Sequence, residues 1–282
     1  MPLSASSVTE AATAAFNVCL LASGSKGNSI YISDGTTNLL LDAGLSGKAI
    51  ENRLARHGLA AGDLTAIIVS HEHSDHIRGV GVLSRRYGLP VYISAATLRA
   101  APQIGKLAQS HSFSVGTPFT IHTLQIHPFA ISHDAADPAG FTIANNGLKV
   151  GVATDLGIAT AMVRERLRAA DLLILEANHD VQMLYNGPYP WPLKQRIKGR
   201  TGHLSNEDTR QLLTELKHDR LRHVVLAHLS ETNNDPGLAR ETVVPALDNA
   251  DIPLTVSGQD RCSAMIRIEG GRHAAHGDSS GS

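Results

Sequence analysis

Short apolar runs that end in polar residues recur along the chain, and their lengths are typical of β-strands. Near the start, this pattern predicts strands over residues 16–22, 29–33 and 37–41. The third predicted strand runs into Asp42-Ala43-Gly44 and precedes a predicted helix that extends to His57. The first part of the chain is therefore expected to contain strands whose ends carry polar side chains.

A similar unit returns in the second half of the chain. Residues 148–154 predict a strand that ends at Asp155-Leu156-Gly157, and residues 159–169 predict the helix that follows. The segments 63–71 and 220–228 are a second similar pair, because each predicts a strand that ends in a histidine. We interpret these pairs as signs of an internal duplication. They predict an α/β fold in which two mixed sheets pack face to face under flanking helices, an αββα sandwich with a site along one edge.

The segment 71–76 reads His-Glu-His-Ser-Asp-His and places three imidazoles and a carboxylate within six residues. It directly follows a short β-branched run, so we expect a loop at the end of a buried strand. His71 and His73 can point to one side, while Asp75 and His76 can reach a second centre nearby. The alternative is a polar loop that merely contains many histidines. The order and density of ligand-type residues favour a metal site, which distant partners must complete.

The length of 282 residues is compatible with one α/β domain or with two smaller ones. Polar residues at predicted strand ends run from Asp42 to His228, so a boundary between them would divide the site. We therefore predict one domain over residues 16–268. The tails, 1–15 and 270–282, are rich in small and polar residues and are predicted to be disordered.

The formal net charge of −1 supplies no global electrostatic argument for a nucleic acid partner. Cys19 and Cys262 lie in apolar runs without ligand-like spacing, which indicates core residues in a reducing compartment. The start of the chain lacks the basic and apolar pattern of a signal peptide, and no apolar stretch reaches membrane-spanning length. These features predict a cytoplasmic protein.

The H-x-H-x-D-H pattern formed by His71, His73, Asp75 and His76 resembles the signature of metallo-β-lactamase fold hydrolases. Within that superfamily, the chain is most similar to the bacterial WalJ/YycJ group of metal-dependent exonucleases. The segments that carry this closer resemblance are residues 23–29, 71–79, 133–141, 176–180, 202–206 and 228–234.

The resemblance implies two metal ions per chain and assigns their ligands. Site one would comprise His71, His73 and His133, site two would comprise Asp75, His76 and His228, and Asp155 would bridge the ions. This set contains imidazoles and carboxylates but no thiolate, which suits zinc or manganese and leaves room for water. A hydroxide bridging the ions would be the nucleophile.

Some of these residues also have plainer interpretations. Asp155 could be the N-cap of the following helix, and His133 could be an ordinary loop histidine. Asp42 could cap a helix too, although the resemblance implies that its carboxylate holds the remaining N–H of a ligand histidine.

His203 is a candidate proton donor for the leaving oxygen, because no metal site requires it as a ligand. Glu176 ends an apolar run and could orient His203, as a Glu and a His do in related phosphodiesterases. In the alternative, Glu176 is a strand-end carboxylate and His203 only precedes a helix near Ser205. His179 is a weaker competitor for the role of the proton donor.

The segment 188–200 combines Tyr189 and Trp191 with four cations, a composition that can stack on bases and contact phosphates. Lys194 and Arg196 are the substrate-binding candidates within it. A solvated helix face is the usual alternative for such a charge run. Residues 23–29 could form a backbone nest for a phosphate, which adds Ser25 and Asn28 as candidates, or could form a plain hairpin turn.

Together these features predict a dinuclear metal-dependent phosphodiester hydrolase, most simply a DNA exonuclease with the 5'-to-3' polarity that the resemblance implies. One alternative is a hydrolase of small esters, thioesters, lactones or small phosphodiesters on the same metal core. Another is a metal-stabilised nucleic-acid-binding module, which would bind without turnover.

Overall fold

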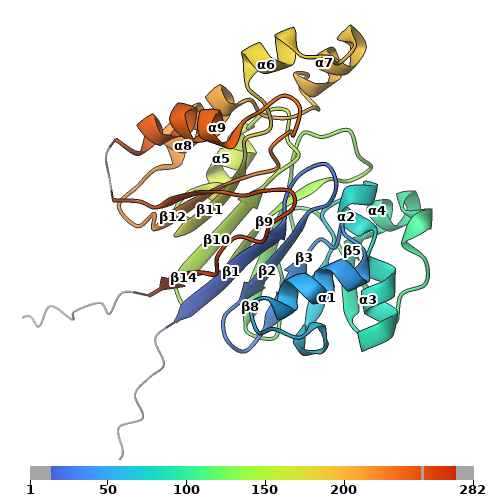
Figure 1. Ribbon diagram of the computed structural model, residues 1–282. Helices are drawn as coiled ribbons and strands as arrows, with labels where there is room; N and C mark the ends of the chain where they lie inside the picture. Colours follow the sequence, from blue (N-terminus) through green and yellow to red (C-terminus); the bar gives the residue numbers. More distant parts are fainter. Residues whose placement is uncertain (1–13, 249–250, 271–282) are drawn as a thin grey trace, which may run out of the picture.

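Two seven-stranded β-sheets lie face to face in the computed structural model, with helices on both outer faces (Figure 1). The structure describes residues 14–248 and 251–270. The predicted αββα sandwich is confirmed. The tails predicted to be disordered lie outside the described residues over 1–13 and 271–282, and the first strand begins at Ala15.

The first sheet is parallel from β3 to β6 and antiparallel elsewhere. Its strands, in spatial order, are β14 (Ile266–Glu269), β1 (Ala15–Ala22), β2 (Ser29–Ser33), β3 (Asn38–Leu41), β4 (Ala66–Ile68), β5 (Pro90–Ser94) and β6 (Gln109–Phe113).

The second sheet is parallel from β10 to β13 and antiparallel elsewhere. Its strands, in spatial order, are β7 (Phe119–Ile121), β8 (Leu124–Ala130), β9 (Ala139–Asn145), β10 (Leu148–Ala153), β11 (Leu172–Glu176), β12 (His223–Ala227) and β13 (Leu254–Val256).

The topology repeats, because β1 to β6 and β8 to β13 share one strand order and one pattern of parallel and antiparallel pairs. Asp42 follows β3 and Asp155 follows β10, which are equivalent strands. By contrast, β12, which precedes His228, is equivalent to β5 and not to β4, which precedes His71. The likeness of segments 63–71 and 220–228 therefore does not follow the structural repeat, whereas the two Asp-x-Gly turns do.

Three apolar layers hold the sandwich together. The central layer packs the inner faces of both sheets, with Phe16 from β1 and Phe141 from β9 almost fully buried. A second layer lies between the first sheet and the helices α1 (Gly47–Ala55) and α3 (Val80–Tyr87). A third lies between the second sheet and the helices α5 (Ala161–Leu167), α8 (Asn206–Leu216) and α9 (Pro236–Val243). Each large apolar side chain buried in this way stabilises the folded state by about 1.5–3 kcal/mol. Apolar packing therefore fixes the positions of the strands and of the polar residues at their ends.

The remaining helical elements are short. They are α2 (Ser74–Ile77), α4 (Ala95–Ala100), α6 (Val181–Asn186), α7 (Trp191–Ile197) and the 3₁₀ turns Ala61–Asp63, Pro102–Ile104 and Val244–Leu247. No helix within the described residues is long and apolar enough to cross a membrane.

Candidate metal centre

Three buried polar residues that follow strands have left-handed backbone conformations. The φ angles are 60° at Asp42, 58° at Asp155 and 56° at His228. A non-glycine residue in this region is uncommon, and strained backbone of this kind costs about 1–3 kcal/mol and tends to occur at functional sites. All three residues are buried, and they lie at the ends of β3, β10 and β12.

The two Asp-x-Gly turns need glycine because other backbone passes close to them. A Cβ atom at Gly44 would lie 1.5 Å from the carbonyl oxygen of Asp75, and one at Gly157 would lie 2.4 Å from the carbonyl oxygen of Arg200. The amide of Ala43 also donates to the carbonyl oxygen of His76 at 2.8 Å. The Gly44 turn therefore holds the histidine loop against the first sheet.

Ring nitrogens of His71, His73 and His133 converge at one end of the sandwich. His71 Nε2 lies 3.1 Å from His73 Nδ1, and His133 Nε2 lies 3.3 Å from the same atom. Donors at 2.0–2.1 Å around a tetrahedral zinc ion lie about 3.3 Å apart. The three nitrogens thus have the spacing of ligands to a single ion.

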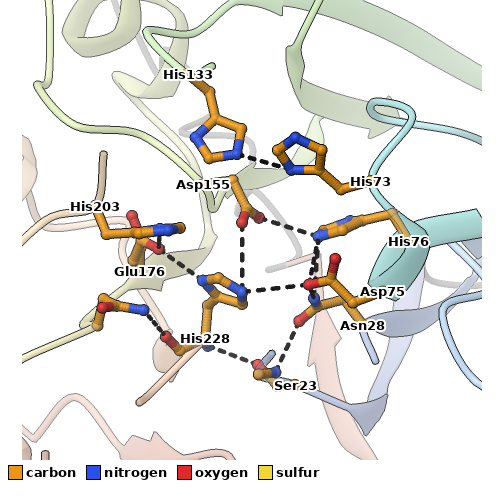
Figure 2. A network of polar contacts seen from close by, with 12 residues as sticks. Ser23, Asn28, His73, Asp75, His76, His133, Asp155, Glu176, His203 and His228 are labelled. Atoms are coloured by element: carbon orange, nitrogen blue, oxygen red, sulfur yellow. Dashed lines mark hydrogen bonds and ion pairs between the residues drawn. The ribbon is translucent and has the colours of Figure 1, made fainter. Parts of the chain in front are cut away.

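Asp75, His76 and His228 form a second group of potential ligands. The Oδ2 atom of Asp75 lies 3.6 Å from His76 Nε2 and 3.9 Å from His228 Nε2. Asp155 adjoins this group, because its Oδ2 is 3.4 Å from His76 Nε2 and its Oδ1 is 3.3 Å from His228 Nε2 (Figure 2). Asp155 also forms a group with His71 and His76, so it lies between the two clusters.

The electrostatics of these groups fit divalent cations. Within the described residues, Asp155 Oδ2 and His228 Nε2 are buried without a hydrogen-bond partner. Burial lowers the pKa of the His71 imidazole well below its ordinary value, which leaves it neutral and able to coordinate. Burial alone would also lower the pKa of His228, but attraction to Asp155 and to the nearby Asp75, together with the hydrogen bond from Nδ1 to Glu176, raises it to about 10. The protons on such imidazoles occupy positions that metal ions would take.

Asp42 lies beside the candidate ligand His76. Its Oδ2 accepts from His76 Nδ1 at 2.8 Å, and both of its oxygens accept from Ser70, through the backbone N–H and the hydroxyl. Helix α1 is capped by Ser46, so Asp42 does not serve as its N-cap. The carboxylate orients the imidazole so that Nε2 points away from Asp42.

Asp155 is likewise not a helix cap, because Thr160 caps α5. Its side chain lies among the imidazoles, in the position expected of a bridging ligand. The sequence-predicted ligands of both sites are therefore brought together by the fold.

Glu176 is fully buried at the end of β11, and its carboxylate accepts four hydrogen bonds. Its Oε1 accepts from His203 Nδ1 at 2.8 Å and from His228 Nδ1 at 2.7 Å. Its Oε2 accepts from the backbone N–H groups of Leu156 and Leu204, at 3.0 and 3.1 Å. Burial opposes ionisation, but attraction to His203 and the hydrogen bonds from both imidazoles lower the pKa of Glu176 to about 2. The carboxylate is therefore ionised at neutral pH.

His203 borders the clusters from the other side. Its ring centre is 5.3 Å from that of His133 and 5.1 Å from that of His228, and 21% of its side chain is exposed. Helix α8 begins with a capping box formed by Ser205 and Asp208, so His203 is not required as a cap. Because its side chain is partly exposed, solvent can reach this imidazole.

Several supporting residues were not singled out individually by the sequence analysis. Ser23 accepts through Oγ from the backbone N–H of His228 at 2.7 Å, and Asn178 donates through Nδ2 to the His228 carbonyl at 2.9 Å. Both residues lie in segments that carry the family resemblance, 23–29 and 176–180. The sequence therefore pointed to these segments but gave no role to either residue. They hold the left-handed backbone of His228 in place.

Asn28 is buried, and its Nδ2 lies 3.2 Å from Asp75 Oδ2 and 3.0 Å from His76 Nε2. Ser25 is exposed in the same loop, and the backbone N–H groups of Gly24, Lys26, Gly27 and Asn28 already donate to protein acceptors. The loop therefore supports the histidine segment directly.

The predicted substrate-binding cations lie on α7, and both are engaged with protein groups. Lys194 Nζ donates to the carbonyl oxygens of Tyr185 and Gly187, each at 2.7 Å, and Arg196 pairs with Asp134 at 2.5 Å. His179 is buried outside the ligand groups, and burial lowers its pKa to about 4.

Comparison with known proteins places this architecture in a family. The beta-lactamase superfamily domain matches residues 37–229. The chain is 42% identical over 232 residues to a Bacillus anthracis protein named exodeoxyribonuclease YycJ, covering 81% of this chain and 88% of that protein. It is 41% identical over 246 residues to exodeoxyribonuclease WalJ of Streptococcus pneumoniae, covering 86% and 91%.

Among solved structures, the metallo-beta-lactamase fold protein YhfI of Bacillus subtilis superimposes with a TM-score of 0.69 at 18% identity, covering 91% of this chain and all of that chain. The chain belongs to the metallo-β-lactamase superfamily and is a metal-dependent hydrolase. Within the superfamily it belongs to the group that contains WalJ and YycJ.

Proposed function

We propose that this protein is a dinuclear metal-dependent DNA exonuclease that degrades its substrate in the 5'-to-3' direction. The names of the two relatives at 41–42% identity support the substrate and the exonucleolytic mode. The observation that carries the proposal is the hydrogen bond between the buried Glu176 and the partly exposed His203 beside both ligand clusters. It provides a proton donor for a poor leaving group, which the cleavage of a nucleic acid strand requires.

His71, His73 and His133 would hold one ion, Asp75, His76 and His228 would hold the other, and Asp155 would bridge them. Two bound zinc or manganese ions would supply an acidified water at neutral pH and would neutralise charge on the scissile phosphate. The imidazoles contribute no charge when they coordinate as neutral ligands, and the set contains two carboxylates. The loaded site therefore keeps net positive charge, which favours a phosphodiester anion.

The proton for the departing oxygen would come from His203. Glu176 accepts from its Nδ1, which leaves Nε2 as the atom that can donate to the substrate. The same hydrogen bond fixes the orientation of the imidazole ring. A single positioned acid of this kind accelerates a reaction by about 10²–10⁴-fold.

The test is an assay of the metal-reconstituted protein on end-labelled single- and double-stranded DNA and RNA. We expect mononucleotides to be released progressively from the 5' end of DNA, with zinc and manganese compared in parallel. Asp75→Ala should abolish the release, and Asp219→Ala, which changes an exposed carboxylate, should not. Release from 3' ends, or cleavage of RNA alone, would contradict the proposed polarity or substrate.

The same preparation should be tested on small esters, thioesters, lactones and cyclic phosphodiesters. We expect turnover of these compounds to be far slower than that of DNA ends. Efficient turnover of a small substrate, with no cleavage of DNA, would instead support the alternative function, the hydrolysis of small molecules.

A further inference from the structure

A pocket of about 190 Å³ opens next to His203, between the helices α6 and α7. These two helices project from the end of the sandwich (Figure 1). The pocket is lined on its apolar side by Leu184, Tyr185 and Trp191, and Lys198 contributes positive charge. His203 is part of its wall, so the pocket adjoins the proposed proton donor.

The aromatic side chains of this pocket are unusually open to solvent. Trp191 is 51% exposed and Tyr185 is 65% exposed, and their rings meet edge to face with centres 6.5 Å apart. The Lys198 ammonium lies over the Trp191 ring, 5.2 Å from its centre, in cation–π geometry. Exposed aromatic side chains next to cations are the combination with which proteins bind single-stranded nucleic acid, through stacking on the bases and attraction of the phosphates.

Polar contacts of Lys194 and Arg196 hold helix α7, which forms one wall of the pocket. Lys194 Nζ donates to the carbonyl oxygens of Tyr185 and Gly187 and so ties α7 to the end of α6. The Arg196 guanidinium pairs with Asp134, which follows the ligand His133. Helix α7, and with it Trp191, is thereby connected to the loop that supplies a metal ligand.

The position of His203 defines which part of a substrate the pocket would meet. His203 would protonate the oxygen that leaves the phosphorus, and that oxygen belongs to the nucleotide on the leaving side of the scissile bond. We propose that the Trp191 pocket binds the nucleobase of this leaving nucleotide. The inference rests on the proposed nuclease function and names the substrate group that the site recognises.

The volume supports a single base as the occupant. Pockets for drug-sized ligands measure about 300–1,000 Å³, and this one measures about 190 Å³. A site for one base beside the proton donor would let the enzyme act on one terminal nucleotide at a time, in keeping with exonucleolytic cleavage.

Trp191 is the one tryptophan of the 282-residue chain, so tryptophan fluorescence reports on this pocket alone. We would titrate the metal-loaded full-length protein with deoxyadenosine monophosphate and, separately, with deoxyribose 5-phosphate, which lacks the base. Saturable quenching by the nucleotide and none by the sugar phosphate is expected. Equal responses to both compounds, or no response to either, would overturn the proposal.

A kinetic test uses DNA whose terminal nucleotide carries either a normal base or an abasic residue. Loss of one stacked base costs roughly 5- to 150-fold in binding. We expect the wild-type kcat/KM to fall by a factor in this range on the abasic end. Trp191→Ala should lose a similar factor on the normal end and little more on the abasic end, and Trp191→Phe should restore most of the activity.

Tyr87→Ala is the matched control, because Tyr87 is an exposed aromatic residue on α3. Metal content by mass spectrometry should be the same in every variant, which shows that the metal ligands are intact. If wild-type protein cut normal and abasic ends equally well, the pocket proposal would be wrong while the nuclease function stood. If wild-type protein cut no nucleic acid, the nuclease function would be wrong, and the fluorescence titration would still decide whether the pocket binds a base.

Discussion

The Oε1 atom of Glu176 accepts hydrogen bonds from two imidazoles, the Nδ1 atoms of His203 at 2.8 Å and of His228 at 2.7 Å. One buried carboxylate therefore orients both a proposed metal ligand and the proposed proton donor (Figure 2). Because the two roles meet at one atom, a change at Glu176 should disturb metal binding and proton transfer together.

Glu176→Gln tests this connection, because it keeps the shape of the side chain and removes its charge. We expect metal affinity at the site that contains His228 to fall by about 10–100-fold, the usual effect of losing a group that orients a ligand. Cleavage of alkoxide-leaving substrates should also slow. Metal content by mass spectrometry and DNA hydrolysis measure the two effects. A variant with full metal affinity and only slower cleavage would show that His228 does not depend on Glu176.

His203→Ala should separate the roles, because His203 is not one of the proposed ligands of either ion. We expect both metals to remain bound while DNA cleavage slows by about 10²–10⁴-fold. Bis(p-nitrophenyl) phosphate has a leaving group that needs little protonation, so its hydrolysis should suffer much less. His111→Ala, at an exposed histidine on β6, is the control. Equal losses on both substrates would remove His203 from the role of the acid.

Asp75→Ala should remove the metal of the second site and nearly all hydrolysis. The fold should persist, because the three apolar layers do not include the ligands. Metal analysis should give about one ion per chain, and circular dichroism should match that of Asp219→Ala. Two ions per chain with wild-type turnover would contradict the dinuclear assignment.

Metal binding should release protons and strengthen as the pH rises. Burial alone would lower the pKa of His76, but attraction to Asp155, Asp42 and Asp75 raises it well above the ordinary value, and the pKa of His228 is raised to about 10. Both imidazoles are thus protonated at pH 7 without metal, and a cation must displace about two protons. Calorimetric titrations at pH 7 in buffers of different ionisation enthalpy measure this number. Heats that do not depend on the buffer would contradict the prediction.

The cations of the segment 188–200 should contribute to nucleic acid binding. Replacing Lys194, Arg196, Lys198 and Arg200 by glutamine should weaken binding to DNA and flatten its dependence on salt, because each lost phosphate contact reduces the slope by about 0.7–0.9. Lys194 and Arg196 already contact protein groups, so a second variant should change only Lys198 and Arg200. An unchanged slope in the fourfold variant would identify the segment as a solvated face.

Much of the first sheet was predictable because its strands are short and apolar. The runs predicted over 16–22, 29–33 and 37–41 correspond closely to β1, β2 and β3. Strand β6 had no such signal, because it lies at a sheet edge and four of its five residues are exposed. An edge strand with little buried surface leaves little periodicity in the sequence.

The amino-acid sequence by itself determined the family, the kind of fold and the candidate ligands. Local sequence patterns are enough to identify the candidate ligands, because the histidine segment spans six residues and each further candidate ligand follows a short apolar run. The tertiary structure alone decided that one oxygen of Glu176 serves both His203 and His228, that Asn28 supports Asp75, and that Trp191 borders a pocket at His203. These relationships join residues from different strands and helices, and their distances depend on how the sheets and helices pack, which no local pattern encodes.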